Sequence, residues 1–212
     1  IQQALNAAKN AGGGIVYLPS GHYRVNSNIV IPTGVELRGS ADMASTPRGQ
    51  GAILEVTVGE GSANGTPLIT MEPKSGLRGI SVNYPKQDAS IFTEVAGSGA
   101  VLAHSVCTPK QYPYAVRGNA DCYIVNLALR ACYQGVDVFT NKCDRHYVDY
   151  ISGHCFKNVI RIGGNSENGT VSNIQCNTIA YGAGDEWKFG LWPNSLHNKD
   201  NKHQDACYQQ SY

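Results

Sequence analysis

Short apolar runs separated by glycine, proline, serine and asparagine dominate the first forty residues. Apolar or small residues recur at helical spacing over residues 1–10, and the glycine run Gly12–Gly14 follows, so we expect a helix there. The next runs are four or five residues long and are bounded by turn-forming residues, which indicates strands. The expected strands are Ile15–Pro19, His22–Val25, Asn28–Pro32 and Val35–Gly39.

The pattern becomes less regular in the middle of the chain. Residues 39–65 are polar and loop-like around AILEVTVG, and strand signals resume at PLITM and LRGISVNY. A long connection over residues 85–113 contains one strand-like piece, AVLAHSV. Strand signals return from Tyr114, and residues 187–212 show no clear period, so we expect irregular structure there.

Two segments in the second half repeat the same order of small, polar and apolar positions. They are YIVNLALRACYQGVDV at 123–138 and HYVDYISGHCFKNVIRI at 146–162. Alignment on Asn126, Asp149 and Asn173 gives spacings of 149 − 126 = 23 and 173 − 149 = 24, and Gly79 lies 126 − 79 = 47 residues earlier, which is two units. A period of this size is typical of a solenoid, and strands without helices predict a β-solenoid in which each unit is one coil.

Stacked coils place equivalent residues above one another at about 4.8 Å. Asn126, Asp149 and Asn173 are therefore predicted to form a polar column with Gly79, which satisfies backbone groups at a bend; a chemical role for Asp149 is the alternative. The same register places Cys132 over Cys155, within reach of a disulfide or as a stack of free thiols.

Composition limits the functional classes. The chain has 212 residues and a net charge of +1, which gives no footprint for nucleic acid, and no apolar run approaches the roughly 20 residues of a membrane span. We expect one domain over 1–212, with a capping helix at 1–14, coils at 15–186 and a tail at 187–212. The chain opens on Ile1 inside a helical pattern, which suggests a segment of a longer protein.

The cysteines and sequons bear on the compartment. Six of the seven cysteines lie between residues 107 and 176, which favours an oxidising, extracellular environment, although buried free thiols would give the same pattern. No CxxC pair occurs, so we do not expect a structural zinc site. No three-acid cluster suited to calcium appears either, and we expect no metal or cofactor. The sequons at Asn64 and Asn168 also fit a secreted glycoprotein.

The first forty residues, IQQALNAAKNAGGGIVYLPSGHYRVNSNIVIPTGVELRGS, closely resemble the opening of the pectate-lyase-like superfamily. That resemblance implies an all-β fold, a right-handed parallel β-helix with a short N-terminal capping helix. GLRGISVNYPKQ, YPYAVRG and YQGVDV are similar to a glycosyl-hydrolase-like subset near the polygalacturonases and α-1,3-glucanases. This implies a secreted protein that handles polysaccharide, but the fold also serves lyases, tailspikes and adhesins.

Glycoside hydrolysis needs two carboxylates, which neighbouring coils could supply. Strand alternation in GVDV points Val136 and Val138 inward and Asp137 outward, and the register stacks Asp137 beside Arg161. We expect either a catalytic acid beside a sugar-binding arginine or an exposed ion pair.

CDRHY concentrates further candidates. The 23-residue spacing stacks Asp144 on Asp121, and such a pair would raise one pKa as a general acid requires, whereas turn capping is the alternative. Arg145, His146 and Tyr133 are candidates for substrate binding. An open groove would be lined by aromatic residues such as Tyr112, Tyr114, Tyr133, Tyr181 or Trp187.

Two departures weaken the hydrolase interpretation. The Asn-Thr-Asp and Asp-Asp motifs of polygalacturonases are absent, and Gly163 and Gly164 stand where we would seek a further acid. We therefore predict a secreted, polysaccharide-acting, glycoside hydrolase-like protein. The alternative is a non-catalytic β-helix, such as an adhesin, a tailspike-like module or a component that binds other chains of an extracellular assembly.

Overall fold

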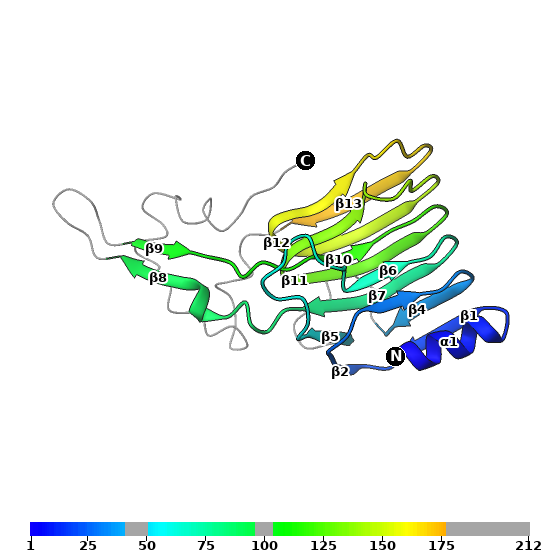
Figure 1. The fold of residues 1–212 in the computed structure, drawn as a ribbon, viewed down its shortest axis with the longest axis horizontal. Helices are drawn as coiled ribbons and strands as arrows, with labels where there is room; N and C mark the ends of the chain where they lie inside the picture. Colours follow the sequence, from blue (N-terminus) through cyan, green and yellow to red (C-terminus); the bar gives the residue numbers. More distant parts are fainter. Residues whose placement is uncertain (41–50, 96–103, 177–212) are drawn as a thin grey trace.

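Parallel strands stack into coils over most of the chain (Figure 1). The computed structural model describes residues 1–40, 51–95 and 104–176. One helix precedes the strands: α1 (Gln2–Asn10). The strands are β1 (Gly14–Leu18), β2 (Gly21–Val25), β3 (Ile29–Ile31), β4 (Val35–Gly39), β5 (Ala52–Val56), β6 (Ile69–Met71), β7 (Gly76–Asn83), β8 (Phe92–Val95), β9 (His104–Cys107), β10 (Tyr114–Arg117), β11 (Tyr123–Val138), β12 (Tyr147–Ile162) and β13 (Thr170–Cys176), with a short 3₁₀ helix, Ala89–Ile91.

The pairing of the strands defines the coils. β1, β2 and β3 form the first coil and pair in parallel with β4, β5 and β6 of the second. β7 and β10 form the third, and the long bent strands β11, β12 and then β13 continue the stack. This arrangement confirms the predicted parallel β-helix with an N-terminal helix, which lies across the first coil (Figure 1).

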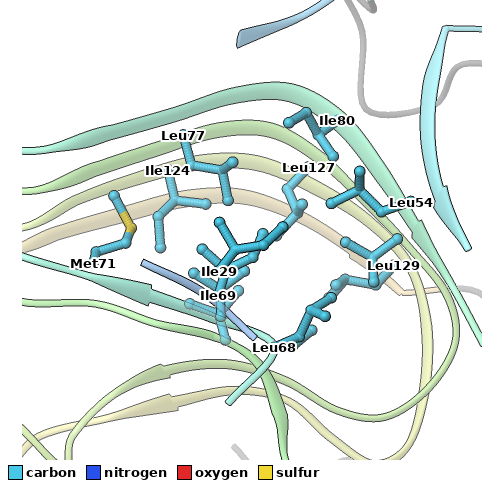
Figure 2. Close-up of a cluster of buried hydrophobic side chains, with 14 of the residues drawn as sticks. Ile29, Leu54, Leu68, Ile69, Met71, Leu77, Ile80, Ile124, Leu127 and Leu129 are labelled. Atoms are coloured by element: carbon cyan, nitrogen blue, oxygen red, sulfur yellow. The ribbon is translucent and has the colours of Figure 1, made fainter. Parts of the chain in front are cut away.

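The interior is a continuous apolar column. Leu37, Leu77, Ile124 and Val148 occupy one register position on successive coils, and each is buried. Figure 2 shows Leu77, Ile124, Ile80 and Leu127 pointing into the same space from adjacent strands. Because equivalent residues stack, each coil covers the apolar surface of its neighbour, as the sequence period predicts.

The strands bend at one position where strict alternation fails. Leu77 and Ile80 both point inward although they are three residues apart, so one residue must absorb the bend. Gly79, Asn126, Tyr150 and Asn173 do so on successive coils, all with positive φ, at 67°, 55°, 53° and 51°. Glycine and asparagine adopt this left-handed conformation most readily.

The predicted polar column is therefore partly wrong. Val125 pairs with Asp149, and Leu127 pairs with Ile151, so Tyr150 and not Asp149 lies level with Asn126. The spacing between these two coils is 24 residues at the bend, one more than the sequence alignment assumed. Gly79, Asn126 and Asn173 share the predicted column, and Asp149 lies one position outside it.

Cysteines stack inside the coils. Cys132 pairs in register with Cys155, as predicted, and both are buried free thiols. Burial raises the pKa of Cys155 well above its ordinary value, and a hydrogen bond from Cys132 adds to that effect. A bond between them stays a prediction for an oxidising compartment.

Two segments differ from the sequence expectation. The region around AILEVTVG, which we expected to be loop-like, contains the strand β5, and this strand pairs with β2 of the first coil. The connection between the two parts of the third coil contains an antiparallel pair, β8 and β9, which projects from the stack (Figure 1). The expected tail at 187–212 and the coil boundary at 186 lie outside the described residues. No helix in the described ranges is long and apolar enough to span a membrane.

Candidate functional site

Outward side chains of the first sheet form a polar and aromatic surface that crosses several coils. Register places Glu36, Gly76, Tyr123 and Tyr147 in one column and Arg38, Arg78, Val125 and Asp149 in the next. Alternation points all of these away from the core. We call the six charged and phenolic residues of these columns the tyrosine–arginine face: Glu36, Arg38, Arg78, Tyr123, Tyr147 and Asp149.

Glu36 is the anchor of this face. Its carboxylate accepts hydrogen bonds from Arg38 Nε, from Arg38 Nη2 at 3.1 Å and from the hydroxyl of Tyr123. Gly76 makes this reach possible, because a Cβ there would lie 2.1 Å from Tyr123 Cζ. Burial raises the pKa of Glu36, but the bonds from Arg38 and Tyr123 outweigh burial and hold it below its ordinary value.

Arg78 is less fully engaged. Its Nε lies 3.8 Å from Glu36 Oε1, which is beyond hydrogen-bond length, and this buried nitrogen has no hydrogen-bond partner among the described residues. The guanidinium carbon lies 5.8 Å from the centre of the Tyr123 ring. With 42% of its side chain exposed, Arg78 can offer its remaining N–H groups to an anion.

A second acid–phenol pair lies two coils from Arg78. Asp149 accepts hydrogen bonds from Tyr147 Oη at 3.1 Å, Ser172 Oγ at 2.7 Å and Asn173 Nδ2 at 2.8 Å. The bond from Ser172 is the main reason why the pKa of Asp149 is lowered, and Asn173 adds to it. The bond to Asp149 raises the pKa of Tyr147, so at neutral pH the carboxyl is ionised and the phenol keeps its proton.

Asp137 is placed differently from the sequence prediction. Its side chain is fully buried, and its carboxylate accepts bonds from the backbone N–H groups of Phe139 and Thr140, both at 3.0 Å, and from Arg117 Nε at 2.9 Å. The predicted exposure of Asp137 is therefore wrong. The register with Arg161 is confirmed, but the guanidinium of Arg161 stacks on Phe139 at 3.7 Å. These contacts favour a structural role at the turn.

Asp121 and Asp144 do not form the predicted stacked acids. Asp121 is bridged by Arg145, with Nε–Oδ1 at 2.6 Å and Nη2–Oδ2 at 2.8 Å. Arg145, and not Asp144, lies level with Asp121 because the spacing at this turn is 145 − 121 = 24 residues, one more than predicted. Asp144 accepts the backbone N–H of Glu167 at 2.9 Å and pairs with Lys142. The bond from Arg145 lowers the pKa of Asp121, and the bond from Glu167 lowers that of Asp144, opposite to the raised pKa a general acid needs.

The remaining candidates are dispersed over the molecule. His146 is buried under Gly169 with Nδ1 2.6 Å from the carbonyl of Cys143, so the structure does not place it at an open surface. Tyr133 is half-buried, with Lys157 Nζ 6.0 Å from its ring centre. Tyr112 and Tyr114 are buried rather than lining a groove. Asn64 and Asn168 are exposed, as glycosylation would require, and Tyr181 and Trp187 lie outside the described residues.

Sequence reasoning missed most of the tyrosine–arginine face. Glu36 and Tyr123 are 87 residues apart, and two coils of unequal length separate them. The signal that could have found them was the alignment of ELRG, GLRG, YIVN and YVDY, which begin at Glu36, Gly76, Tyr123 and Tyr147. No group of three or more His, Cys, Asp or Glu side chains suited to a metal ion occurs in the described part of the chain.

Three comparisons with known proteins bear on the family. No curated protein matches the chain significantly. Among solved structures, the A-module of mannuronan C-5 epimerase AlgE4 from Azotobacter vinelandii is 18% identical, with a TM-score of 0.43 over 82% of this chain and 51% of that one. The A-module of AlgE6 from the same organism is 21% identical, with a TM-score of 0.34 over 84% and 52%. This chain thus spans about half the length of each epimerase module.

A third structure, from Parabacteroides merdae and provisionally described as a glycosyl hydrolase, is 14% identical, with a TM-score of 0.40 over 83% of this chain and 84% of that one. All three scores lie below 0.5, so the assignment rests on the protein-family comparison. The family model described as rhamnogalacturonase A/epimerase, pectate lyase-like, matches residues 1–206. The chain belongs to this pectate lyase-like family.

Proposed function

We propose that this protein acts on an acidic polysaccharide, which it binds along the tyrosine–arginine face. The observation that carries the proposal is the state of Arg78: 42% of its side chain is exposed and its 3.8 Å contact with Glu36 is longer than a hydrogen bond, whereas Arg38 satisfies Glu36. A guanidinium with free N–H groups pairs well with a carboxylate, which every uronic acid residue provides. Family membership supports a polysaccharide as the ligand.

The face is suited to proton transfer beside that carboxylate. Register puts Asp149 two strands from Arg78, and strands are spaced at about 4.8 Å, so one guanidinium and the Tyr147–Asp149 pair can contact neighbouring parts of one sugar chain. Neutralisation of a uronate by Arg78 would make the adjacent C–H more acidic. In this proposal the ionised Asp149, which is 7% exposed, takes the C–H proton, and Tyr147, which is 43% exposed, donates its own proton to the resulting carbanion or to the leaving oxygen. The proton on Asp149 then returns to the Tyr147 phenolate through the hydrogen bond that joins them.

Glycoside hydrolysis stays a prediction that the face supports less well. Hydrolases need a carboxylic acid with a raised pKa. The pKa values of Glu36, Asp121, Asp137, Asp144 and Asp149 are all lowered. Secretion fits the same proposal, since acidic polysaccharides are extracellular substrates. A non-catalytic binding module would use Arg78 in the same way without the proton transfer.

The test is binding and turnover on polygalacturonate, on mannuronan and on a neutral β-glucan. We expect binding to the two polyuronates but not to the glucan. The Arg78→Met variant should bind polyuronate at least tenfold more weakly, because a charge-assisted contact is lost. Arg24→Met is the matched control, since Arg24 is an exposed arginine of β2, outside this face, and it should bind like wild type. Equal binding by Arg78→Met and wild type would refute the proposed site.

Three readouts separate the reactions. Release of reducing ends without an unsaturated sugar indicates hydrolysis, an unsaturated product indicates elimination, and deuterium uptake at C5 from heavy water without chain cleavage indicates epimerisation. Binding with none of the three supports the non-catalytic module. Because Tyr147 is proposed as the proton donor, Tyr147→Phe should abolish turnover and leave polyuronate binding nearly unchanged.

A further inference from the structure

Tyr150 occupies a backbone position that suits tyrosine poorly. It has φ 53° at the bend of β12, level with Asn126 on one side and Asn173 on the other. The equivalent residue on the third coil is Gly79, also left-handed. A bulky side chain at positive φ is strained, whereas glycine and asparagine accept this conformation at little cost. Stability alone would therefore select glycine or asparagine here.

The strained side chain is not compensated by packing. Tyr150 is 51% exposed, and its hydroxyl makes no hydrogen bond to any described residue. A large aromatic ring in this setting loses the usual benefit of core burial. Persistent local strain in an over-determined framework is a feature of ligand-binding and catalytic sites.

The position of Tyr150 relates it to the tyrosine–arginine face. It directly follows Asp149, whose lowered pKa includes a contribution from the backbone N–H of Tyr150. Its phenol is also near enough to Tyr147 to contribute to the raised pKa of that residue. The bend therefore places an exposed ring at the border of the face, beside the Tyr147–Asp149 pair.

We propose that Tyr150 is a sugar-stacking residue whose ring packs against the apolar face of a pyranose. Arg78 binds the carboxylate of the same sugar or of the adjacent sugar in the chain. This inference rests on the proposed polysaccharide function. The left-handed backbone directs the side chain to solvent instead of to the core, so the ring is presented without any change in the coil. The strained backbone thus holds the aromatic ring of Tyr150 in a fixed, exposed position.

The experiment uses the Tyr150→Asn variant, for which the proposal predicts higher stability and weaker polysaccharide binding. Asparagine relieves the strain, so the thermal unfolding midpoint should rise by about 2–4 °C. Loss of the stacked ring should weaken binding to polygalacturonate or mannuronan by about tenfold. Tyr150→Phe is the matched control: it keeps the ring and the strain, and both quantities should equal those of wild type. Tyr150→Gly provides a second strain-relieving variant that also removes the ring.

The outcomes separate this inference from the function on which it rests. If wild type binds polyuronate and both Tyr150→Asn and Tyr150→Gly bind equally well, the stacking role is wrong and the proposed function stands. If wild type binds neither polyuronate, both proposals fail. An unfolding midpoint that falls in both variants would show that the bend does not strain Tyr150, and would remove the reason for the assignment.

Discussion

Two clusters on the outside of the same β-helix combine an acid with arginine, yet they differ in what they leave available. At the Asp137 turn, the carboxylate is fully buried and is satisfied by two backbone N–H groups and by Arg117. On the tyrosine–arginine face, Arg78 retains unused N–H groups, and 42% of its side chain is exposed. The residue types are similar in both places. What distinguishes the structural cluster from the candidate binding surface is how many of the charged groups' hydrogen bonds are made within the protein.

The largest effect should come from the Asp137 turn. Asp137→Asn removes a buried charge that Arg117 and two turn amides require, so we expect a loss of about 3 kcal/mol in the free energy of unfolding. Urea denaturation measures this. Asp149→Asn, the corresponding change on the tyrosine–arginine face, should cost less. A larger loss from Asp149→Asn would reverse the comparison.

The stacked thiols of Cys132 and Cys155 provide a third site for comparison, one that is uncharged and lies in the interior. Oxidation of Cys132 and Cys155 would close a loop of 155 − 132 = 23 residues and stabilise the fold by roughly 3 kcal/mol in the chain-entropy model. Thiol titration under denaturing conditions, on protein produced in an oxidising compartment, should find the same number of thiols in the wild type as in the Cys132→Ala/Cys155→Ala double variant, which is two fewer than the seven cysteines of the chain. Seven titratable thiols in the wild-type chain would contradict any disulfide.

A smaller effect is expected at high pH. Burial, with the bond to Glu36, raises the pKa of Tyr123 to about 12. A raised folded-state pKa contributes stability that is complete below the ordinary value near 10 and is lost as the pH rises toward 12. Because Tyr123 is partly exposed, we expect under about 1 kcal/mol. Thermal unfolding from pH 8 to pH 11.5 should fall more steeply for wild type than for Tyr123→Phe, and parallel curves would contradict this.

The smallest effect should come from an exposed pair. Arg145 bridges Asp121 with two good hydrogen bonds, but both side chains contact water. Solvent screening makes such pairs weak, so Arg145→Gln should change the unfolding midpoint by no more than the error of the measurement. A clear drop in stability at both high and low salt would show that the stacked turns at Asp121 and Arg145 depend on this pair.

The sequence predicted the interior of the coils better than their surface. Apolar positions such as Leu77 and Ile124 stack as the repeat predicts. Cys132 and Cys155 also pair at the predicted spacing of 23 residues, although a register shift lies on each side of them. Between β11 and β12 the spacing is 24 residues almost throughout, a slip of one residue from the expected 23. That slip is why Asp149 was expected where Tyr150 lies, and why Asp121 meets Arg145 and not Asp144.

The candidate site was harder to predict for a related reason. Contacts on the face join residues from coils separated by insertions, so the link from Glu36 to Tyr123 depends on the three-dimensional register. The burial of Asp137 also escapes alternation rules. Its position in the strand is outward, but the turn that follows folds its own amides over the carboxylate.

The helix α1 has a consequence for how the molecule behaves among its own copies. The first coil is the lower edge of the stack, with β1, β2 and β3 each paired on one side only within the described sheet. An open parallel edge can recruit another chain at the normal strand spacing and grow into a fibre. Leu5 of α1 is inserted into the core, with Ile1 and Ala8 packed beside it, and the helix lies against β1 and β3. We therefore expect α1 to hinder another chain from pairing with this part of the edge.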